Sequence, residues 1–420
     1  MTQQIIAVAV FVLVMAAVVS EKIHRAAAAI AGALLVVLTG ILTFEESLGF
    51  IDFNTLGVLI GMMVFVGVVK ESGLFEFLAI KAAKVAKGNP WKIMVLFIII
   101  TAVLSAFLDN VTTVLLIGPM TLTICGILKI NPIPFLMTQI LASNVGGTST
   151  LIGDPPNIMI GSAAGLSFGA FISNLALPVI VILIVFIFCF RFMYGRKMSA
   201  DQSAMQLVMQ LDEKKAIKDK ALFIKSIIMI LVVVLGFVLH GVIHVDSSVV
   251  ALSAAAIMLV IGKQDVEEIV CHIEWTTILF FVGLFVVVGG MEKVGIIHAL
   301  ADMLINATNG QLVVTMVIIV WASAIISAIL DNIPFCATMI PVIMTMEASG
   351  MDVMPLWWAL SLGACLGGNG SLIGASANVV LSGIANREGH PITFMSFLKV
   401  GFPMMIISVA IATVYLLIRF

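Results

Sequence analysis

A polar segment at residues 143–157 interrupts one of the long apolar stretches of this chain. It reads SNVGGTSTLIGDPPN, with three glycines, two adjacent prolines and an aspartate. Glycine and proline both oppose a regular helix, because glycine loses more backbone entropy on ordering and proline lacks an amide donor. Within a membrane, broken backbone is stable only where protein or a water-filled cavity satisfies its polar groups. The segment therefore predicts a broken helix that lines a binding site.

The rest of the sequence is that of a polytopic membrane protein. Of 420 residues, 62% are hydrophobic and 10% are charged, whereas a soluble domain has roughly 25% charged residues. The net charge of -2 argues against nucleic acid as a partner. The five cysteines lack paired spacing, so we predict neither a disulfide framework nor a zinc site. Residues 5–20 follow no basic segment, which favours a first spanning helix over a cleaved signal peptide.

Apolar runs of about 20 residues predict the spanning helices. Whole spans are expected at 5–20, 25–43, 55–70, 170–194, 223–241, 247–262, 276–292 and 396–419. Two further runs, 92–128 and 311–346, contain a turn at their middle, which favours a re-entrant hairpin over two full crossings. The runs 134–164 and 355–386 are broken segments. Segments 75–87 and 296–305 have the pattern of amphipathic helices at the membrane surface.

The second half of the chain repeats the first. Asp109 recurs as Asp331, 222 positions later (331 minus 109), and Gly147 recurs as Gly368, 221 positions later. We therefore predict an all-α polytopic membrane protein made of two repeats of five spans each. Because five is odd, the second repeat is inverted, and inverted repeats with re-entrant hairpins and broken helices are typical of secondary transporters. The predicted divisions are the first inverted repeat at 1–194, a linker at 195–222 and the second inverted repeat at 223–420.

Basic residues predict the orientation, since loops rich in lysine and arginine stay in the cytoplasm. They gather at 70–92 and in the linker, whereas the loop with Glu45 and Glu46 is acidic. We expect a multi-pass protein of the plasma membrane, which is the inner membrane in a bacterium. The linker is expected in the cytoplasm, with both termini outside. Charged loops are usually solvated, and we expect the same of this linker.

Three aspartates lie deep in the apolar segments: Asp109, Asp154 and Asp331. A charged side chain at the bilayer centre is costly, so by default it marks an ion or proton pathway. The alternative is that each aspartate caps a half-helix by accepting amide hydrogen bonds. Asp154 has no acidic counterpart, because Ala375 occupies the matching position. We treat all three as proton-coupling candidates, and Asp154 as the candidate for a role that one repeat alone supplies.

Amides, hydroxyls and unwound backbone complete the candidate substrate and ion site, since broken helices offer carbonyl oxygens to cations and amides to anions. These members lie at the hairpin turns and in the two breaks: Asn110, Thr112, Thr113, Asn144, Gly146, Gly147, Thr148, Thr150, Gly153, Asn157, Asn332, Gly367, Gly368, Asn369, Ser371, Gly374 and Asn378. Cys336 is a candidate metalloid ligand, although a lone buried cysteine is more often a small hydrophobe. We predict no other metal site, no cofactor and no catalytic residue, with H+ or Na+ as the coupling ion.

The residues around these aspartates resemble a known group. LDNVTT at 108–113, the segment 143–165 and LDNIP at 330–334 resemble the arsenite permease, NhaD-type antiporter and pigmentation P-protein group of the ion transporter superfamily. The group is distantly similar to the divalent-anion/sodium symporters. The resemblance covers nearly the whole chain and implies two inverted five-span repeats, a homodimer and an elevator-type moving domain. The symporters carry Ser-Asn-Thr at each hairpin tip, and aspartate in that place favours proton coupling.

The resemblance implies a secondary active ion transporter. Our preferred hypothesis is a proton-coupled efflux permease for arsenite and antimonite. The alternatives are a sodium/proton antiporter and a sodium- or proton-coupled anion transporter, and a channel is a further class that also needs polar backbone at mid-membrane. The expected partners are membrane lipid and a small inorganic ion, and the resemblance also allows a cytoplasmic ATPase. An enzyme is not expected, because the Gly-x-Gly-Asp motif of intramembrane aspartyl hydrolases is absent before Asp154.

Overall fold

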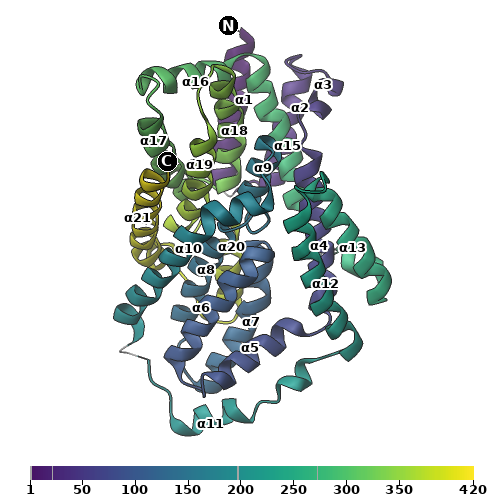
Figure 1. Ribbon diagram of the computed structural model, residues 1–420, viewed down its shortest axis with the longest axis vertical. Coiled ribbons are helices and arrows are strands. Elements are labelled where there is room, and N and C mark those ends of the chain that lie inside the picture. Colours follow the sequence, from purple (N-terminus) through teal and green to yellow (C-terminus); the bar gives the residue numbers. More distant parts are fainter. Residues whose placement is uncertain (1, 21, 196–197, 272) are drawn as a thin grey trace.

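The computed structural model describes residues 2–20, 22–195, 198–271 and 273–420, and helices are the only regular elements in those ranges (Figure 1). Positions 196–197 of the predicted linker lie outside the described residues. The first half contains α1 (Thr2–Ser20), α2 (Arg25–Leu38), α3 (Phe44–Gly49), α4 (Phe53–Lys70), α5 (Leu74–Val85), α6 (Pro90–Phe107), α7 (Asn110–Leu128), α8 (Ile133–Gly147), α9 (Pro155–Ala164) and α10 (Phe168–Phe190).

The linker and the second half contain further helices, which follow the same order as the first half from α12 onward. They are η1 (Arg191–Gly195), α11 (Gln202–Gln210), η2 (Glu213–Ala216), α12 (Lys220–Leu239), α13 (Ser247–Gly262), α14 (Val266–Cys271), α15 (Trp275–Lys293), α16 (Ile296–Ala307), α17 (Leu312–Ile329), α18 (Asn332–Ala348), α19 (Met354–Gly367), η3 (Gly368–Gly370), α20 (Ser376–Arg387) and α21 (Phe394–Arg419).

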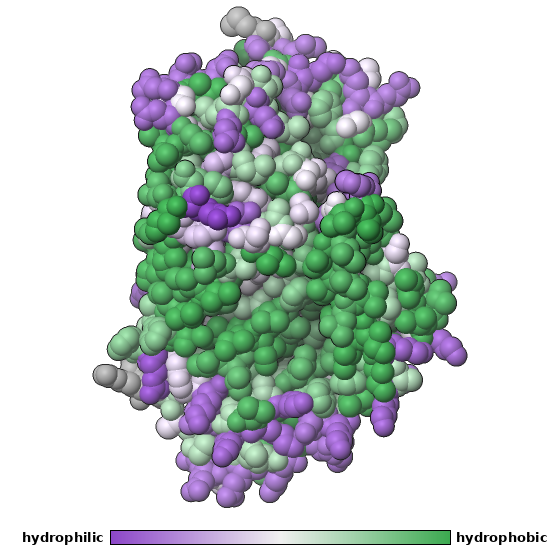
Figure 2. Space-filling model, viewed as in Figure 1, coloured by the Kyte–Doolittle hydropathy of each residue, from purple (hydrophilic) through white to green (hydrophobic). Residues whose placement is uncertain are grey.

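Nine of the helices within the described ranges are long and apolar enough to cross a membrane. Figure 2 shows a broad hydrophobic belt between two polar ends of the molecule. The chain is thus an all-α polytopic membrane protein, as the apolar runs predict. The hairpin helices α6, α7 and α17 are among the nine, so their length is compatible with full crossing, and their re-entrant path stays a prediction.

In each half, one short helix packs on a long helix of the other half. Helix α2 packs on α15 of the second half, and α13 packs on α4 of the first. Gly61 of α4 lies against the backbone of Ala251, and Gly283 of α15 lies against the backbone of Ala29, so a Cβ at either glycine would overlap main-chain atoms. Each pair is related by 222 positions (283 minus 61, 251 minus 29). This reciprocal packing fits a two-fold relation between the repeats, whose inversion in a membrane stays a prediction.

Each broken segment is fixed to its hairpin by matching hydrogen bonds. Ser105 Oγ of α6 donates to Ser143 O at 2.7 Å, and Ser327 Oγ of α17 donates to Ala364 O at 2.7 Å. Two further bonds repeat the match, from the hydroxyl of Thr150 to Ala106 O and from that of Ser371 to Ala328 O. The hydroxyls therefore satisfy the main chain where the helices break, as a membrane interior demands.

Most charged side chains of the described linker residues are exposed, as their charges predict, but part of the linker packs against the first half. Helix α11 buries Ala204 and Val208. Lys84 of α5 donates to Leu211 O at 2.9 Å and also forms an ion pair with Glu213, which lowers the pKa of that carboxyl from its usual value. In Figure 1 the linker lies at the opposite end of the molecule from the N-terminus. Its predicted place in the cytoplasm stays a prediction.

Candidate functional site

The two breaks meet at the centre of the molecule through asparagine side chains. Asn144 Nδ2 donates to Asn369 Oδ1 and to Asn378 Oδ1, both at 2.9 Å. Asn110 Nδ2, at the first hairpin tip, donates to Asn144 Oδ1 at 3.1 Å. All four side chains are buried. The repeats are therefore joined by amide groups whose polar atoms are largely used by one another.

Two of the predicted asparagines also close their own breaks. Asn157 Nδ2 donates to Thr150 O and Asn378 Nδ2 donates to Ser371 O, each at 2.8 Å. Ser361 Oγ donates to Asn157 Oδ1 at 2.6 Å, which links the first break to α19. Buried polar groups need such partners. These amides hold the breaks in place and are not free ligands in this conformation.

The glycines allow the breaks to pack closely. A Cβ at Gly146 would overlap the backbone of Ala102, and one at Gly367 would lie 2.6 Å from Cα of Ala324. The other four predicted glycines, Gly147, Gly153, Gly368 and Gly374, bring the two ends of each break against each other. The sequence predicts that their backbone joins the site. None of the six lines the central cavity described below, and their place in a substrate or ion site stays a prediction.

Asp154 lies between α8 and α9 and is 0% exposed. Its carboxylate accepts hydrogen bonds from Asn332 Nδ2 at 3.2 and 3.3 Å, and it forms no salt bridge with any described residue. Its side chain accepts no cap hydrogen bond from α9 either, and the first two residues of that helix, Pro155 and Pro156, have no amide hydrogen to donate. The interpretation of Asp154 as a helix cap is therefore wrong.

Asp109 and Asp331 differ although they occupy matching tips. Asp109 accepts hydrogen bonds from the amide of Thr112 at 2.8 Å and from its hydroxyl, so it caps α7. At the second tip, Pro334 replaces Thr112 and supplies neither donor. The side chain of Asp331 makes no cap hydrogen bond. It binds Arg25 instead, with Arg25 Nη1 at 2.9 Å from Asp331 Oδ2.

Arg25 is a site residue that the sequence interpretation misses. Its guanidinium also donates to Ser376 Oγ at 2.6 Å and to Thr277 Oγ1 at 3.0 Å. Thr277 in turn donates to Glu274 at 3.0 Å. A basic residue beside a span normally indicates membrane orientation, which conceals such a role. The available signal is a departure from the repeat, since Ser247 stands where a second arginine would (247 minus 25, or 222).

A cavity of about 20 Å³ lies at the centre of this arrangement. Its charged lining consists of Asp109, Asp154, Glu274 and Arg25, joined by Asn110, Asn332, Thr277, Ser376 and apolar side chains. A cavity of this volume is about large enough for one water molecule. Four of the predicted residues thus meet at one cavity: Asp109, Asn110, Asp154 and Asn332.

Larger cavities border this central cavity on two sides. A cavity of 270 Å³ shares Arg25 and Ser376 with it and also reaches Asp331. A cavity of 120 Å³ shares Met63 and Glu274 with it and contains the predicted residue Thr112. A repeat-related cavity of 150 Å³, with Asp52 in place of Glu274, shares no lining residue with the central cavity. The surroundings of the site are therefore unequal on its two sides.

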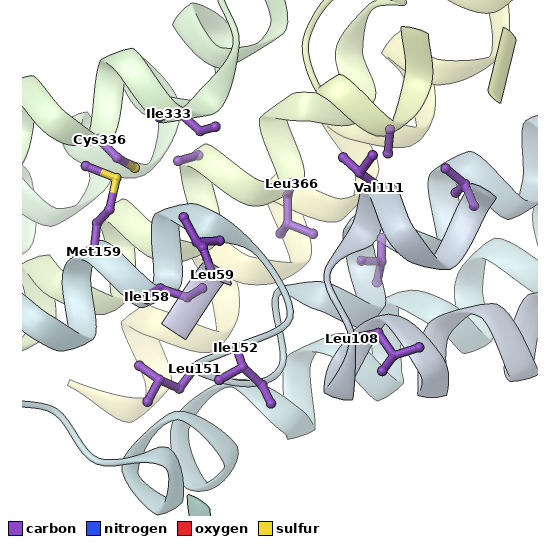
Figure 3. Close-up of a cluster of buried hydrophobic side chains, with 14 of the residues drawn as sticks. Leu59, Leu108, Val111, Leu151, Ile152, Ile158, Met159, Ile333, Cys336 and Leu366 are labelled. Carbon is purple, nitrogen blue, oxygen red and sulfur yellow. The ribbon is translucent and has the colours of Figure 1, made fainter. Parts of the chain in front are cut away.

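The remaining predicted residues lie near the site without lining the central cavity. Thr148 Oγ1 donates to Asn144 O at 2.7 Å, and the hydroxyl of Thr113 is buried without a partner. Figure 3 shows Cys336 within a cluster of buried hydrophobic side chains that includes Ile158 and Met159 of α9. Among the residues with described positions, no three His, Cys, Asp or Glu side chains could hold a metal ion. This environment favours the interpretation of Cys336 as a small hydrophobe.

Comparison with known families places the chain among transporters. The family model described as "CitMHS: Citrate transporter" matches residues 15–363. The chain belongs to the CitMHS family. The predicted relationship to the ion transporter superfamily is thereby confirmed, and the chain is a multi-pass secondary transporter.

Curated relatives of this CitMHS transporter include bacterial and animal proteins. An uncharacterized transporter of Mycobacterium tuberculosis is 41% identical over 425 residues, which cover 99% of this chain and 98% of the relative. The "46 kDa membrane protein" of Mycobacterium leprae is 40% identical and is 99% covered. The P protein of Homo sapiens is 33% identical over 502 residues, which cover 99% of this chain but 60% of the P protein.

A solved structure supports the fold of the CitMHS transporter. The YdaH transporter of Alcanivorax borkumensis, described as having an unusual topology, superposes with a TM-score of 0.57. The match covers 89% of this chain and 87% of YdaH at 17% sequence identity. Likeness at this identity concerns the fold alone.

Proposed function

We propose that this chain is a proton-coupled permease that exports arsenite or antimonite, with Asp154 as the carrier of the coupling proton. The observation that carries the proposal is the complete burial of Asp154 without a salt bridge to any described residue. A buried, uncompensated carboxylate is costly, so it binds a proton or a cation. Because Ala375 occupies the matching position, one repeat alone supplies this group.

The charged lining of the central cavity supports an uncharged solute over an anion. Arsenite in neutral water is the uncharged trihydroxide, whose hydroxyls suit the amide of Asn332 and the carboxylates nearby. A citrate trianion would meet three carboxylates and one guanidinium in this lining. The carboxylates of the solute and those of the lining would repel one another. We therefore do not extend the substrate in the family description to this chain.

Sodium/proton exchange is the second candidate. The observation in its favour is the same carboxylate-rich lining, since carboxylate and amide oxygens around a water-sized cavity suit a small cation. Both candidates predict saturable, pH-driven transport, whereas a channel would give large unitary currents. The unequal cavities on the two sides of the site support a transporter that alternates between two faces.

Asp154→Asn in proteoliposomes tests the proposal. Wild-type protein should release arsenite in response to an imposed pH gradient and move protons in response to an arsenite gradient. In Asp154→Asn both responses should be lost, while exchange of labelled arsenite at equal pH continues. Asp302→Asn is the matched control, because Asp302 lies exposed on α16.

A growth assay separates the substrates. The chain should protect a host stripped of its own exporters against arsenite and antimonite. Protection against sodium but not arsenite would replace the proposal with sodium/proton exchange. An unchanged pH dependence in Asp154→Asn would move the proton to another residue.

A further inference from the structure

The guanidinium of Arg25 forms an ion pair with Asp331 at the second hairpin tip. Arg25 also lines the central cavity. We propose that Arg25 is a specificity-determining residue. Its guanidinium is the counter-ion of Asp331 and so prevents sodium and other metal cations from binding to that carboxylate. This inference rests on the proposed function, in which Asp154 alone takes up the coupling proton. In this role Arg25 removes the carboxylate of Asp331 from the groups beside the site that could hold a metal ion.

The guanidinium is anchored from two sides. Thr277 of α15 accepts a hydrogen bond from Nη2 at 3.0 Å, and the ring of Phe280 lies with its centroid 5.5 Å from Cζ of Arg25. On the other side, Nη1 reaches Asp331 Oδ2 at 2.9 Å and Ser376 Oγ at 2.6 Å. A guanidinium with this many fixed partners is preorganised for one carboxylate. Arg25 therefore binds Asp331 as a defined ligand and not as a loosely placed surface charge.

Asp331 retains a binding capacity that Arg25 does not use. Its side chain is 10% exposed, and Oδ1 is buried without a hydrogen-bond partner, whereas Oδ2 receives Arg25 and Ser376. A carboxylate with one unpartnered buried oxygen would bind a cation strongly if its counter-ion left. Arg25 thus determines whether the second tip is a cation site.

The first tip shows the alternative arrangement. Asp109 is occupied by the amide and hydroxyl of Thr112, and the position matching Arg25 is Ser247. The second tip has no such cap, because Pro334 has no amide hydrogen. One tip therefore satisfies its carboxylate with a cap and the other with a guanidinium, and Asp154 has neither.

A sodium-dependent shift in melting temperature tests this role without any transported solute. The detergent-purified protein is melted in sodium chloride and in choline chloride at equal ionic strength. A ligand that binds only the folded state raises the melting temperature with its concentration. Wild type and Arg25→Lys should melt alike in both salts, and Arg25→Gln should melt higher in sodium, with a shift that grows with its concentration. Arg25→Gln/Asp331→Asn should lose that shift.

Ser376→Ala keeps the test decisive if Arg25→Gln does not fold. It removes one anchor of the guanidinium but keeps the charge, and should show a smaller sodium shift in the same direction. Stabilisation of the wild type by sodium, or no sodium shift in either folded variant, would overturn the inference. If the shift occurs but arsenite transport fails, the role of Arg25 stands and the proposed function falls.

Discussion

The two hairpin tips begin with the same Leu-Asp-Asn sequence but use the aspartate in different ways. At the first tip, Asp109 binds the amide and hydroxyl of Thr112 in its own helix. At the second, Asp331 binds Arg25, which lies 306 positions away in the sequence. The difference follows from the residue three positions after each aspartate. A threonine offers two donors there and Pro334 offers none, so a local substitution decides whether the carboxylate serves a cap or a distant helix.

This difference separates the parts of the repeat that build the scaffold from the parts that build the site. Hydrogen bonds between the hairpins and the breaks occur in matching pairs, for example from Ser105 and Ser327. The groups that line the central cavity include departures from the repeat, such as Arg25 and Asp154. Matching residues hold a symmetric framework, and unmatched residues make the centre chemically asymmetric. Asymmetry of this kind is what the proposed role of Asp154 requires, because one repeat alone supplies that carboxylate.

Neutralising the two tip aspartates should give the largest contrast. Asp331→Asn leaves Arg25 without its counter-ion, and breaking a buried pair costs up to about 3–5 kcal/mol. Because the side chain of Arg25 is 25% exposed, we expect the free energy of unfolding to fall by the lower part of that range. We also expect transport to fall at least tenfold, which corresponds to about 1.4 kcal/mol.

The matched change at the first tip, Asp109→Asn, should keep transport within about threefold, because an amide oxygen can still accept the Thr112 amide hydrogen. Initial rates in proteoliposomes, normalised to inserted protein, measure both variants. Equal losses at the two tips would show that both carboxylates act in transport.

Transferring the threonine from one tip to the other should give an intermediate effect. Pro334→Thr provides the second tip with an amide and a hydroxyl, so Asp331 is divided between a cap and Arg25. We expect transport to fall by roughly twofold to fivefold while the protein gains up to about 1 kcal/mol from the new cap. Pro341→Thr, in the same helix but away from the tip, controls for the loss of a proline. A Pro334→Thr variant with wild-type transport and higher stability would mean that the Arg25 pair is dispensable.

The sequence predicts most of this architecture because membrane burial leaves strong local signals. The apolar runs locate the helices, and the polar turn beside Asp109 locates the hairpin tip, since α6 ends at Phe107 and α7 begins at Asn110. The repeat offset also predicts which residues occupy matching places. These features depend on hydrophobicity and backbone chemistry, which are determined by residues close together in the sequence.

The sequence does not predict the partners of Arg25 or the packing of the linker. The guanidinium meets Thr277, Asp331 and Ser376, which are 252 to 351 positions away, so no local pattern indicates the contact. The linker helix α11 buries only two residues, Ala204 and Val208, which gives a weak apolar signal. The asparagines mislead in another way. Their polarity indicates a ligand site equally well as an internal hydrogen-bond network, and tertiary contacts decide between the two.

The smallest effect should come from the hydroxyl that completes the cap at the first tip. Thr112→Val removes the hydrogen bond from Oγ1 to Asp109 but keeps the amide donor, so it should lower the free energy of unfolding by about 1 kcal/mol or less. Transport and its pH dependence should match the wild type, because Asp109 remains a cap. Denaturation in detergent measures the first quantity, and vesicle flux at several pH values measures the second. Because valine has nearly the shape of threonine, a shifted pH profile would have to come from the freed carboxylate oxygen. Such a shift would make Asp109 a second proton carrier and remove the distinction between the two tips.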